Sequence, residues 1–562
     1  MTLNRNIVIT SIVAYFLLTV YAVYFKFFPV IFSPIISNIF LLGVLAILLG
    51  ILVIQPFLVK MKSELYCVLP QYLIFAFVTR AIPTLRLTYQ PLADPYYYII
   101  STLNIADFGT LEPVLSWWYG LTQQQLSWPD LHIIGSSLMT FTGIQSIEIL
   151  RYVLPGMGAV FFLGVFLLAK EITNNVSVAL LAGLFASTSD SVLFYQSEYH
   201  PQGIAFIYFV FFLVLIIRYF STPSLVNGSL MIVYALVFSL SHHFSSVFFG
   251  MLSVFFLLSF WIFQSFFSRY INFNDSKQYN YYILPWTIIA ILMFFSHIFK
   301  YPAFLKVVSS AMMNEIVPIR ALITYGPTVP LQATILNSLK YLLLGLAIIS
   351  ILYIFKSKNK KEFFCFIILI GILIAGAIGT FIAFIPVDRL IGFYVPFAAL
   401  FASLTLYRFH DVWLSKWRTK YKKIIIVVIS LMILIAGPLN FFGPALIFHD
   451  SPKDPYYWHC NDYSGFSSYG VPGDWIKKYI SQQSTFSSYN DTFMIPYFYG
   501  QIPATRGYSD GKSSVETGYY IFPLNIIEDQ NPSISQLRIY AINILYNSDN
   551  YEVAIKSNQF NR

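Results

Sequence analysis

The sequence GIAFIYFVFFLVLIIRYF, residues 203–220, decides the fold class of this chain. Its only charged residue is Arg218, close to the end of the run. An apolar stretch of about 20 residues is the length that crosses a bilayer as an α-helix, so the run predicts a transmembrane helix. The polar stretch YQSEYHPQ, residues 195–202, comes directly before it. We therefore expect a polar motif at the membrane face where this helix begins.

Apolar runs of the same kind fill most of the 562 residues. Hydrophobic residues make up 57% of the chain and charged residues 10%, against about 25% charged in a soluble domain, which excludes a soluble enzyme. We predict an all-α polytopic membrane protein with thirteen transmembrane helices. The predicted spans are 7–28, 37–59, 64–80, 146–169, 176–194, 203–220, 228–243, 245–265, 282–299, 335–355, 362–385, 388–407 and 424–446. The boundary at Ser241-His242-His243 is either a helix break or the gap between two short helices.

Charge predicts the orientation of these spans. The net charge of +9 would suit nucleic acid or a membrane, but the basic residues lie in short loops between apolar runs. The two most basic loops are KSKNKK at 356–361 and RFHDVWLSKWRTKYKK at 408–423. Both become cytoplasmic, as the positive-inside rule requires, if the N-terminus is cytoplasmic. We therefore expect a multi-pass cell-membrane protein with an extracytoplasmic tail and no nucleic-acid partner.

The domain organisation follows from this topology. Residues 1–446 form the predicted transmembrane domain, with outer loops at 81–145, 195–202 and 300–334. The first outer loop is rich in Tyr and Trp, which favour the headgroup region, so we expect helices that lie along the membrane surface. Residues 447–562 lack apolar runs and are punctuated by Gly, Pro, Ser and Asn. They predict a small extracytoplasmic α/β domain.

Two outer loops carry candidate chemistry. Asp94 opens DPYYY after the third span, and Glu198 and His200 stand in the loop before the sixth. A carboxylate and an imidazole two residues apart can face one ion in an extended loop, or they can bind an acceptor. Oxygen and imidazole ligands together suit manganese, iron or zinc, and a mostly oxygen site suits magnesium. The cation expected here is Mn²⁺ or Mg²⁺. The structural alternative is equally simple. Asp94 before Pro95 and His200 before Pro201 are also typical of helix starts.

Four further candidates are less directly placed by the sequence. Asp190 lies near the outer end of span five, and Arg320 lies in the third outer loop. His242 and His243 fall within the membrane, where polar groups are costly and indicate function, or they hydrogen-bond within a helix break. The carboxylates that share the outer face with Asp94 are Asp107, Glu112, Asp130 and Glu148.

DPYYY in an aromatic outer loop and SEYHPQGIAF before the next span resemble the catalytic subunit of oligosaccharyltransferases, and more broadly the GT-C superfamily of membrane glycosyltransferases. This resemblance implies that Asp94 is the catalytic carboxylate and that Glu198 and His200 are the second-loop pair. It also implies that Arg389, in PVDRLIGFY, grips the phosphate of the carrier lipid. The alternative for Arg389 is a side chain that snorkels from a helix end.

The chain departs from oligosaccharyltransferases in its tail, which has no WWDYG motif for reading the Asn acceptor. The resemblance therefore implies transfer of a sugar from polyprenyl or dolichyl phosphate to a glycan, lipid or protein acceptor, a cell-envelope glycosylation. Its partners would be that donor, the acceptor and membrane lipids. The alternatives are an oligosaccharyltransferase with a divergent acceptor site and a transporter of lipid or glycan. A transporter path lined with charges is not evident, because the spans are nearly free of acidic residues.

Overall fold

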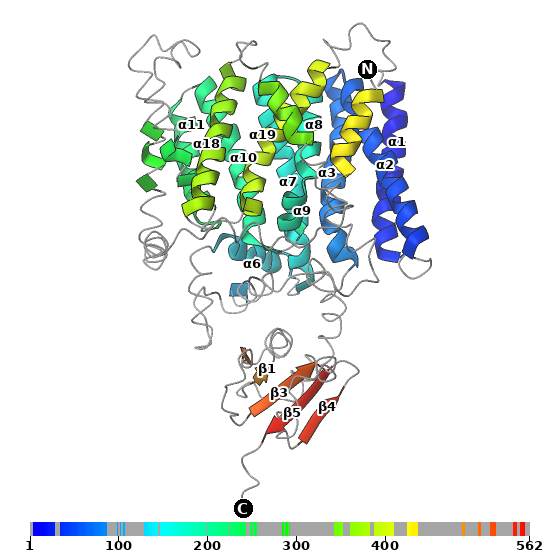
Figure 1. Cartoon of the computed structure of the whole chain (residues 1–562), viewed down its shortest axis with the longest axis vertical. Helices are drawn as coiled ribbons and strands as arrows, with labels where there is room; N and C mark the ends of the chain where they lie inside the picture. Colours follow the sequence, from blue (N-terminus) through cyan, green and yellow to red (C-terminus); the bar gives the residue numbers. More distant parts are fainter. Residues whose placement is uncertain are drawn as a thin grey trace, which may run out of the picture. The chain divides into compact units, whose positions relative to one another are not determined.

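The computed structural model describes two groups of residues. The first comprises 4–27, 34–86, 129–143, 147–197, 199–222, 224–242, 342–351, 360–382, 387–409 and 424–435, with a few shorter pieces between them, and the second comprises five strands near the C-terminus. The chain divides into two compact units, of which the first holds the helices and the second holds the strands. Figure 1 shows the elements along the chain.

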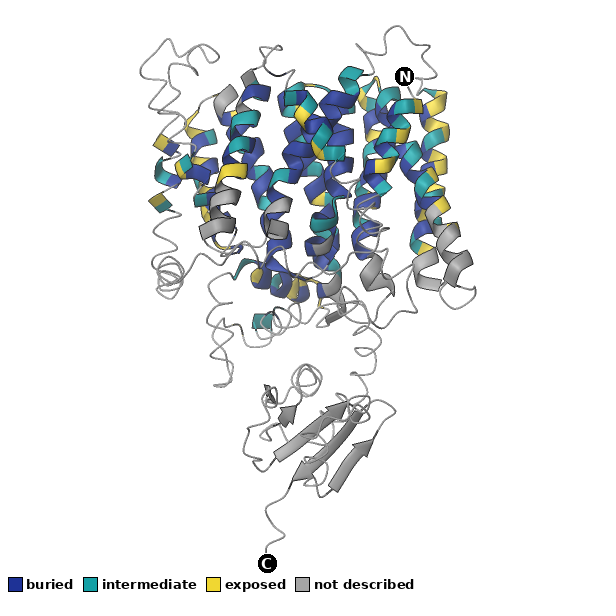
Figure 2. Cartoon of the chain, viewed as in Figure 1, coloured by how far each residue is buried: buried dark blue, intermediate teal, exposed yellow. Residues whose placement is uncertain are grey.

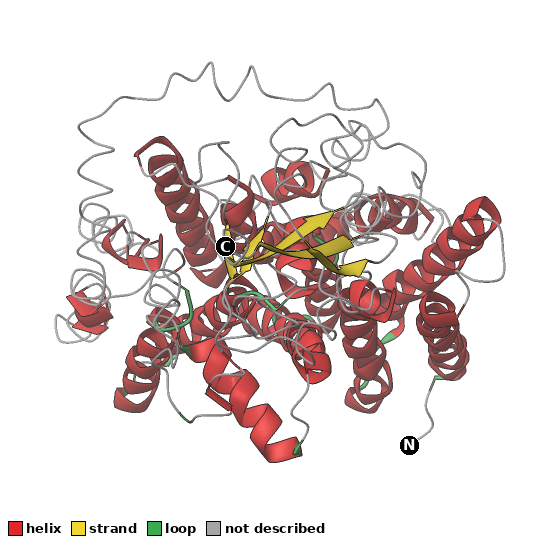
Figure 3. Cartoon of the chain, turned by 90° about the horizontal axis from the view of Figure 1, so that it is seen from below, coloured by secondary structure: helices red, strands yellow, loops and turns green. Residues whose placement is uncertain are grey.

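The helices of the first unit stand side by side as a bundle (Figures 1 and 3). Their bounds are α1 Arg5–Phe27, α2 Pro34–Leu58, α3 Lys62–Arg86, α6 Asp130–Thr142, α7 Ile147–Thr173, α8 Val176–Ser187, α9 Asp190–Ser197, α10 Pro201–Ser221, α11 Leu225–Ser239, α18 Lys360–Ile382 and α19 Val387–Arg408. Within the described residues, three helices are long and apolar enough to cross a membrane, or four if α8 and α9 form one bent span. The chain is therefore a membrane protein, while the count of thirteen spans stays a prediction.

The bundle is built around α7, which packs against α3, α8 and α10. Side chains at its centre are buried, whereas α1 exposes Ile9, Ile12 and Phe16 (Figure 2). Exposed apolar side chains are expected on the outside of a membrane protein, because lipid tails are themselves apolar and solvate them. The helices thus form one apolar bundle in which a buried polar group is an exception.

The fifth predicted span, 176–194, is not one straight helix. It is α8 followed by α9, and the two axes differ by 68°. Thr188, at the break, donates from its hydroxyl to the carbonyls of Leu184 and Phe185, at 3.1 and 3.2 Å. A hydroxyl that hydrogen-bonds one turn back competes with the backbone ladder and often bends a helix.

The outer loop predicted at 195–202 is also too long. α9 continues to Ser197 and α10 begins at Pro201, so the described connection is only a few residues. This shortening brings the end of α9 directly beside the first turn of α10. It therefore places the polar motif against the bundle rather than on an extended loop.

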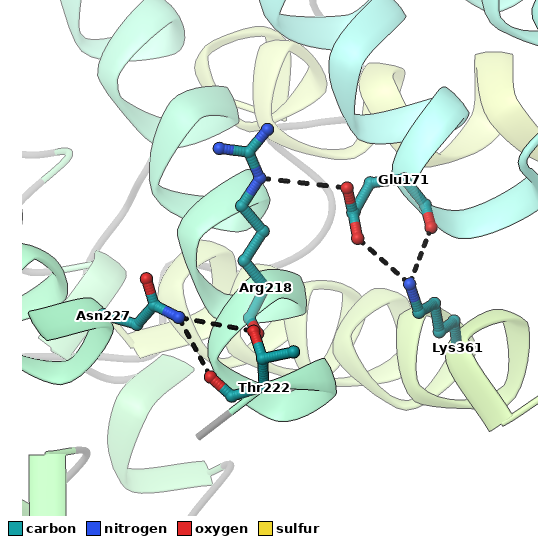
Figure 4. Close-up of polar contacts among 5 residues, drawn as sticks. All are labelled: Glu171, Arg218, Thr222, Asn227 and Lys361. Atoms are coloured by element: carbon teal, nitrogen blue, oxygen red, sulfur yellow. Dashed lines mark hydrogen bonds and ion pairs between the residues drawn. The ribbon is translucent and has the colours of Figure 1, made fainter. Parts of the chain in front are cut away.

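One end of the bundle carries paired charges, and Figure 4 draws those around Glu171. Glu171 near the end of α7 accepts from Lys361 Nζ at 3.0 Å and lies 3.8 Å from Arg218 Nε. Arg408 in α19 pairs with Glu362 in α18 at 2.8 Å. The turn after α10 is held by Asn227, whose amide donates to the Thr222 carbonyl at 2.9 Å. Arg218, Lys361 and Arg408 lie at helix ends, beside the loops that the orientation predicted from charge makes cytoplasmic, and the structure brings them to one end of the bundle.

The second unit is a five-stranded mixed sheet of order β2-β1-β3-β5-β4. Its strands are β1 Phe486–Ser488, β2 Ala504–Arg506, β3 Gly518–Pro523, β4 Asn543–Asn547 and β5 Tyr551–Lys556. β1 runs parallel to β2 and β3, and β5 runs antiparallel to β3 and β4. The helical part of the predicted α/β domain and the boundary predicted at 446/447 lie outside the described residues.

Candidate functional site

His200 begins α10, as the Pro201 after it predicts. Its Nδ1 accepts from the backbone N–H of Gln202 at 3.1 Å, with Pro201 in the first turn. A ring nitrogen that accepts carries no proton, so the neutral ring holds its proton on Nε2. The side chain is buried. His200 therefore has two roles that can be separated: Nδ1 caps the helix, and Nε2–H is a donor.

His242 lies beside His200, with their ring centroids 6.1 Å apart. It follows the end of α11 at Ser239, where the sequence predicts a break. Its Nδ1 lies 3.1 Å from the Ser245 hydroxyl and accepts from the Ser245 N–H at 3.4 Å. The break after α11 thus meets the start of α10, and two histidines predicted from separate stretches come together.

Arg80 in α3 is the polar residue of this region that sequence reasoning missed. Its side chain is fully buried. Nε donates to Gln196 Oε1 at 2.7 Å, and Nη1 donates to the Ala76 carbonyl at 2.9 Å. Gln196 in turn donates to the Gly203 carbonyl in the first turn of α10 at 3.4 Å. Arg80 therefore joins α3 to the α9–α10 junction.

Two glycines make this junction possible. A Cβ on Gly158 in α7 would stand 1.9 Å from Arg80 Cδ, so only glycine leaves room for the arginine stem. A Cβ on Gly203 would stand 2.2 Å from the Tyr195 carbonyl oxygen, so glycine allows α9 and α10 to meet. The positions of Arg80 and His200 are therefore set by close backbone packing, not by surface loops.

Arg389 lies in the first turn of α19, and the backbone places it level with this junction. Phe393, one turn further along α19, packs edge-on against Phe206 of α10 at 5.1 Å, and Phe397 lies 6.5 Å from Phe209. The two helices therefore run in the same direction with their starts side by side. Residues 387–390 of α19 therefore lie toward the same end of the bundle as the first turn of α10.

α6 lies across the end of the bundle where α10 begins (Figure 1). The Tyr199 hydroxyl donates to the Leu131 carbonyl at 2.8 Å, and the Thr102 hydroxyl bridges Tyr199 and His132 at 2.9 and 3.0 Å. The residues of α6 that are exposed are Ile133, Leu138 and Phe141. Apolar exposure at a bundle end is typical of a helix that lies in the membrane interface.

Asp130 at the start of α6 is a second carboxylate on this face. Burial raises the pKa of Asp130, and a hydrogen bond from the Tyr208 hydroxyl lowers it in part. Tyr208 packs edge-on against Tyr234 of α11 at 5.7 Å. Asp130 thus ties α6 to α10.

Asp190 stands at the opposite end of α9 from Gln196. Its carboxylate accepts from the N–H of Ser191 at 2.8 Å. α9 continues past it to Ser197, so Asp190 is deeper in the bundle than the sequence suggests.

Asp94, Glu198, Arg320 and His243 lie outside the described residues, and for Arg389 only the backbone is described. Their roles stay predictions. Within the described residues no three His, Cys, Asp or Glu side chains gather as a metal site would require. The His200 contact bears on the cation directly, because a metal-bound histidine normally donates its other ring N–H, whereas Nδ1 of His200 accepts.

The chain resembles the GT-C superfamily in this fold. The fold is similar to that of ArnT from Cupriavidus metallidurans, solved with undecaprenyl phosphate bound. The two chains are 10% identical, and the similarity covers 87% of this chain and 98% of that one with a TM-score of 0.52. At this identity the similarity establishes the fold.

A looser similarity is to the oligosaccharyltransferase of Archaeoglobus fulgidus, solved with a tethered acceptor peptide that contains the NVT sequon. Identity is 14%, coverage is 80% of this chain and 61% of that one, and the TM-score is 0.42. No protein-family profile matches the sequence. No characterised protein matches it by sequence either.

Proposed function

We propose that this chain is a membrane glycosyltransferase that moves one sugar from a polyprenyl or dolichyl phosphate to a glycan, lipid or protein acceptor. The observation that carries the proposal is the polar junction of Arg80, Gln196 and His200, buried at one end of an otherwise apolar bundle. Intramembrane polar groups are costly and mark functional sites. ArnT, whose fold is similar, binds undecaprenyl phosphate, which supports a polyprenyl carrier here.

The proposed reaction is a direct displacement at the anomeric carbon. An acceptor hydroxyl oxygen forms a bond to that carbon while the bond to the phosphate oxygen breaks, and the phosphate leaves with the electron pair. Asp94 takes the hydroxyl proton as general base. The positive charge of Arg389 stabilises the leaving phosphate. His200 donates from Nε2 to an acceptor oxygen or to a neighbouring carboxylate.

We also propose a divalent cation at this site, held by two of the three candidate ligands that the sequence offers. Nδ1 of His200 is engaged as the cap of α10, so the proposed ligands are the carboxylates of Asp94 and Glu198. Oxygen ligands favour Mg²⁺ or Mn²⁺. We expect chelation to abolish turnover and either ion to restore it. Full turnover in excess EDTA would leave Asp94 and Glu198 as acceptor-binding groups.

The experiment that tests the function is a donor screen on the purified full-length protein. Polyprenyl-phosphate sugars are offered one at a time, and mass spectrometry follows the release of free polyprenyl phosphate. We expect release from one or a few donors, and its loss in Asp94→Asn. Movement of intact lipid-linked sugar across vesicles without release would instead indicate a transporter.

In the same proposal the chain has thirteen spans, a cytoplasmic N-terminus and an extracytoplasmic tail. The site then faces the outer leaflet, where lipid-linked sugars are presented after translocation. The support is the separation of charges in the structure. Arg218 and Lys361 pair with Glu171 at one end of the bundle, and His200 lies at the start of α10, the other end of the helix that carries Arg218.

A further inference from the structure

Arg80 differs from two other described arginines, Arg218 and Arg408, in its charge partners. Arg218 and Arg408 each face a carboxylate and are partly exposed. Arg80 is fully buried, and its Nη2 has no hydrogen-bond partner. Within the described part of the chain no carboxylate pairs with it. A guanidinium stays charged at any working pH, so among the described residues this buried positive charge has no counter-charge.

A buried charge of this kind is strongly unfavourable unless something pairs with it. The neighbouring helix α7 nevertheless accommodates this arginine, because Gly158 leaves the space that the Arg80 stem occupies. Gln196 fixes the guanidinium through Nε at 2.7 Å, which leaves the Nη2 side for another acceptor. Nη2 is therefore the part of the guanidinium that is left for a further acceptor.

The position of Arg80 indicates which anion this is. It lies six residues before the end of α3 at Arg86, which is about 9 Å along a helix. The interfacial helix α6 lies at this end of the bundle. The start of α10 adds the positive end of a helix dipole, although its first N–H groups are already satisfied by His200. A phosphate at headgroup depth fits this setting.

We propose that Arg80 is a direct donor to the phosphate of the lipid carrier, with Gln196 as the positioning residue that holds its guanidinium. The inference rests on the proposed function for the identity of the lipid. Because Arg80 is covered on all sides, phosphate entry must be coupled to an opening at the α9–α10 junction. Arg80 and Arg389 would then hold the phosphate from two different helices.

The test measures binding rather than turnover, on the full-length protein in detergent. Farnesyl monophosphate is the probe, farnesol is the matched probe without phosphate, and inorganic phosphate is the competitor. Arg80→Met keeps the length of the side chain and removes its charge. The control is Arg218→Met, which makes the same change in the last turn of α10, far from the α9–α10 junction. We expect Arg80→Met to weaken farnesyl phosphate about 10- to 100-fold, as loss of a hydrogen bond to a charged group predicts. Farnesol binding and the Arg218→Met variant should be unaffected.

Farnesol binding separates this role from a structural one, because Arg80→Met also removes the hydrogen bonds to Gln196 and Ala76. A structural role predicts that farnesol and farnesyl phosphate are weakened equally, whereas a phosphate donor predicts that farnesyl phosphate alone is weakened. An unchanged farnesyl phosphate affinity in Arg80→Met would overturn the inference. So would inorganic phosphate that displaces the probe at equal concentration, because the site would then not require a lipid. If Arg80→Met does not fold, Arg80→Lys decides in the same assay, since it keeps the charge and loses the planar fork. Failure of the donor screen would leave these binding results intact.

Discussion

At residue scale, the sharpest prediction concerns Asp94. Asp94→Asn removes the charge and basicity but keeps a side chain that caps helices about as well. If Asp94 is the general base, turnover should fall about 10²- to 10⁴-fold while the melting temperature stays the same. Asp130→Asn is the matched control, because Asp130 is the same kind of residue on α6 and is tied to Tyr208. Near-normal turnover in Asp94→Asn, with loss in Asp130→Asn, would move the base to α6.

His200 gives a second prediction at this scale, because its two ring nitrogens have different roles. His200→Asn should keep the cap on α10 and the melting temperature, while His200→Ala loses about 1 kcal/mol of stability. Both variants lack the Nε2 donor, so both should lose about tenfold in turnover. Ser224→Ala removes the cap of α11 and should lower only the melting temperature. Normal turnover in His200→Asn would restrict His200 to capping.

These residues also show how far sequence reasoning reaches. Pro201 after His200 predicts a helix start, and Ser241-His242-His243 predicts a break, and both are present. The predicted third span, 64–80, ends at Arg80 and assigns it no role. Nothing local distinguishes a buried arginine from one that snorkels, since its burial depends on Gly158 in another helix. One signal could have indicated its burial: Arg80 is a charged residue within a helix that continues to Arg86.

At element scale, the meeting of α9 and α10 depends on Gly203. Gly203→Ala would place a Cβ 2.2 Å from the Tyr195 carbonyl oxygen, and backbone cannot move aside as a side chain does. We expect the two helices to separate, with a loss of about 1–3 kcal/mol and of turnover, since Arg80 and His200 are held there. Gly156→Ala in α7 is the control, because its Cβ would meet nothing within 4 Å. Equal melting temperatures for the two variants would contradict this packing.

The helices themselves were mostly predictable. The spans predicted at 203–220 and 388–407 are α10 at 201–221 and α19 at 387–408, because length and apolarity decide where a chain crosses lipid. The bend between α8 and α9 was not predicted. Apolar content does not record the direction of a helix axis, and the Thr188 hydrogen bonds that accompany the bend are available to any threonine in a helix.

At the scale of the whole molecule, the separation of charge organises the bundle. Paired charges hold α7, α10 and α18 together at one end. The other end gathers the histidines, Arg80 and the interfacial helix α6. Among the described residues, basic side chains at one end pair with carboxylates, whereas Arg80 near the other end pairs with none. We propose that this division suits an enzyme that binds its lipid substrate at one leaflet.

Cysteine labelling determines which leaflet that is. With a cytoplasmic N-terminus and thirteen spans, an odd number, position 512 in the tail is extracytoplasmic and position 358 is cytoplasmic. Lys512→Cys and Lys358→Cys are made in a chain without Cys67, Cys365 and Cys460, and intact cells are treated with a maleimide that cannot cross membranes. We expect label at 512 only, and label at 358 after permeabilisation, which shows that this position is reactive. Label at 358 in intact cells would mean that His200 and Arg80 lie at the cytoplasmic end of the bundle. It would then exclude a donor presented on the outer leaflet, because the junction that holds these residues lies at the opposite end of α10 from Arg218.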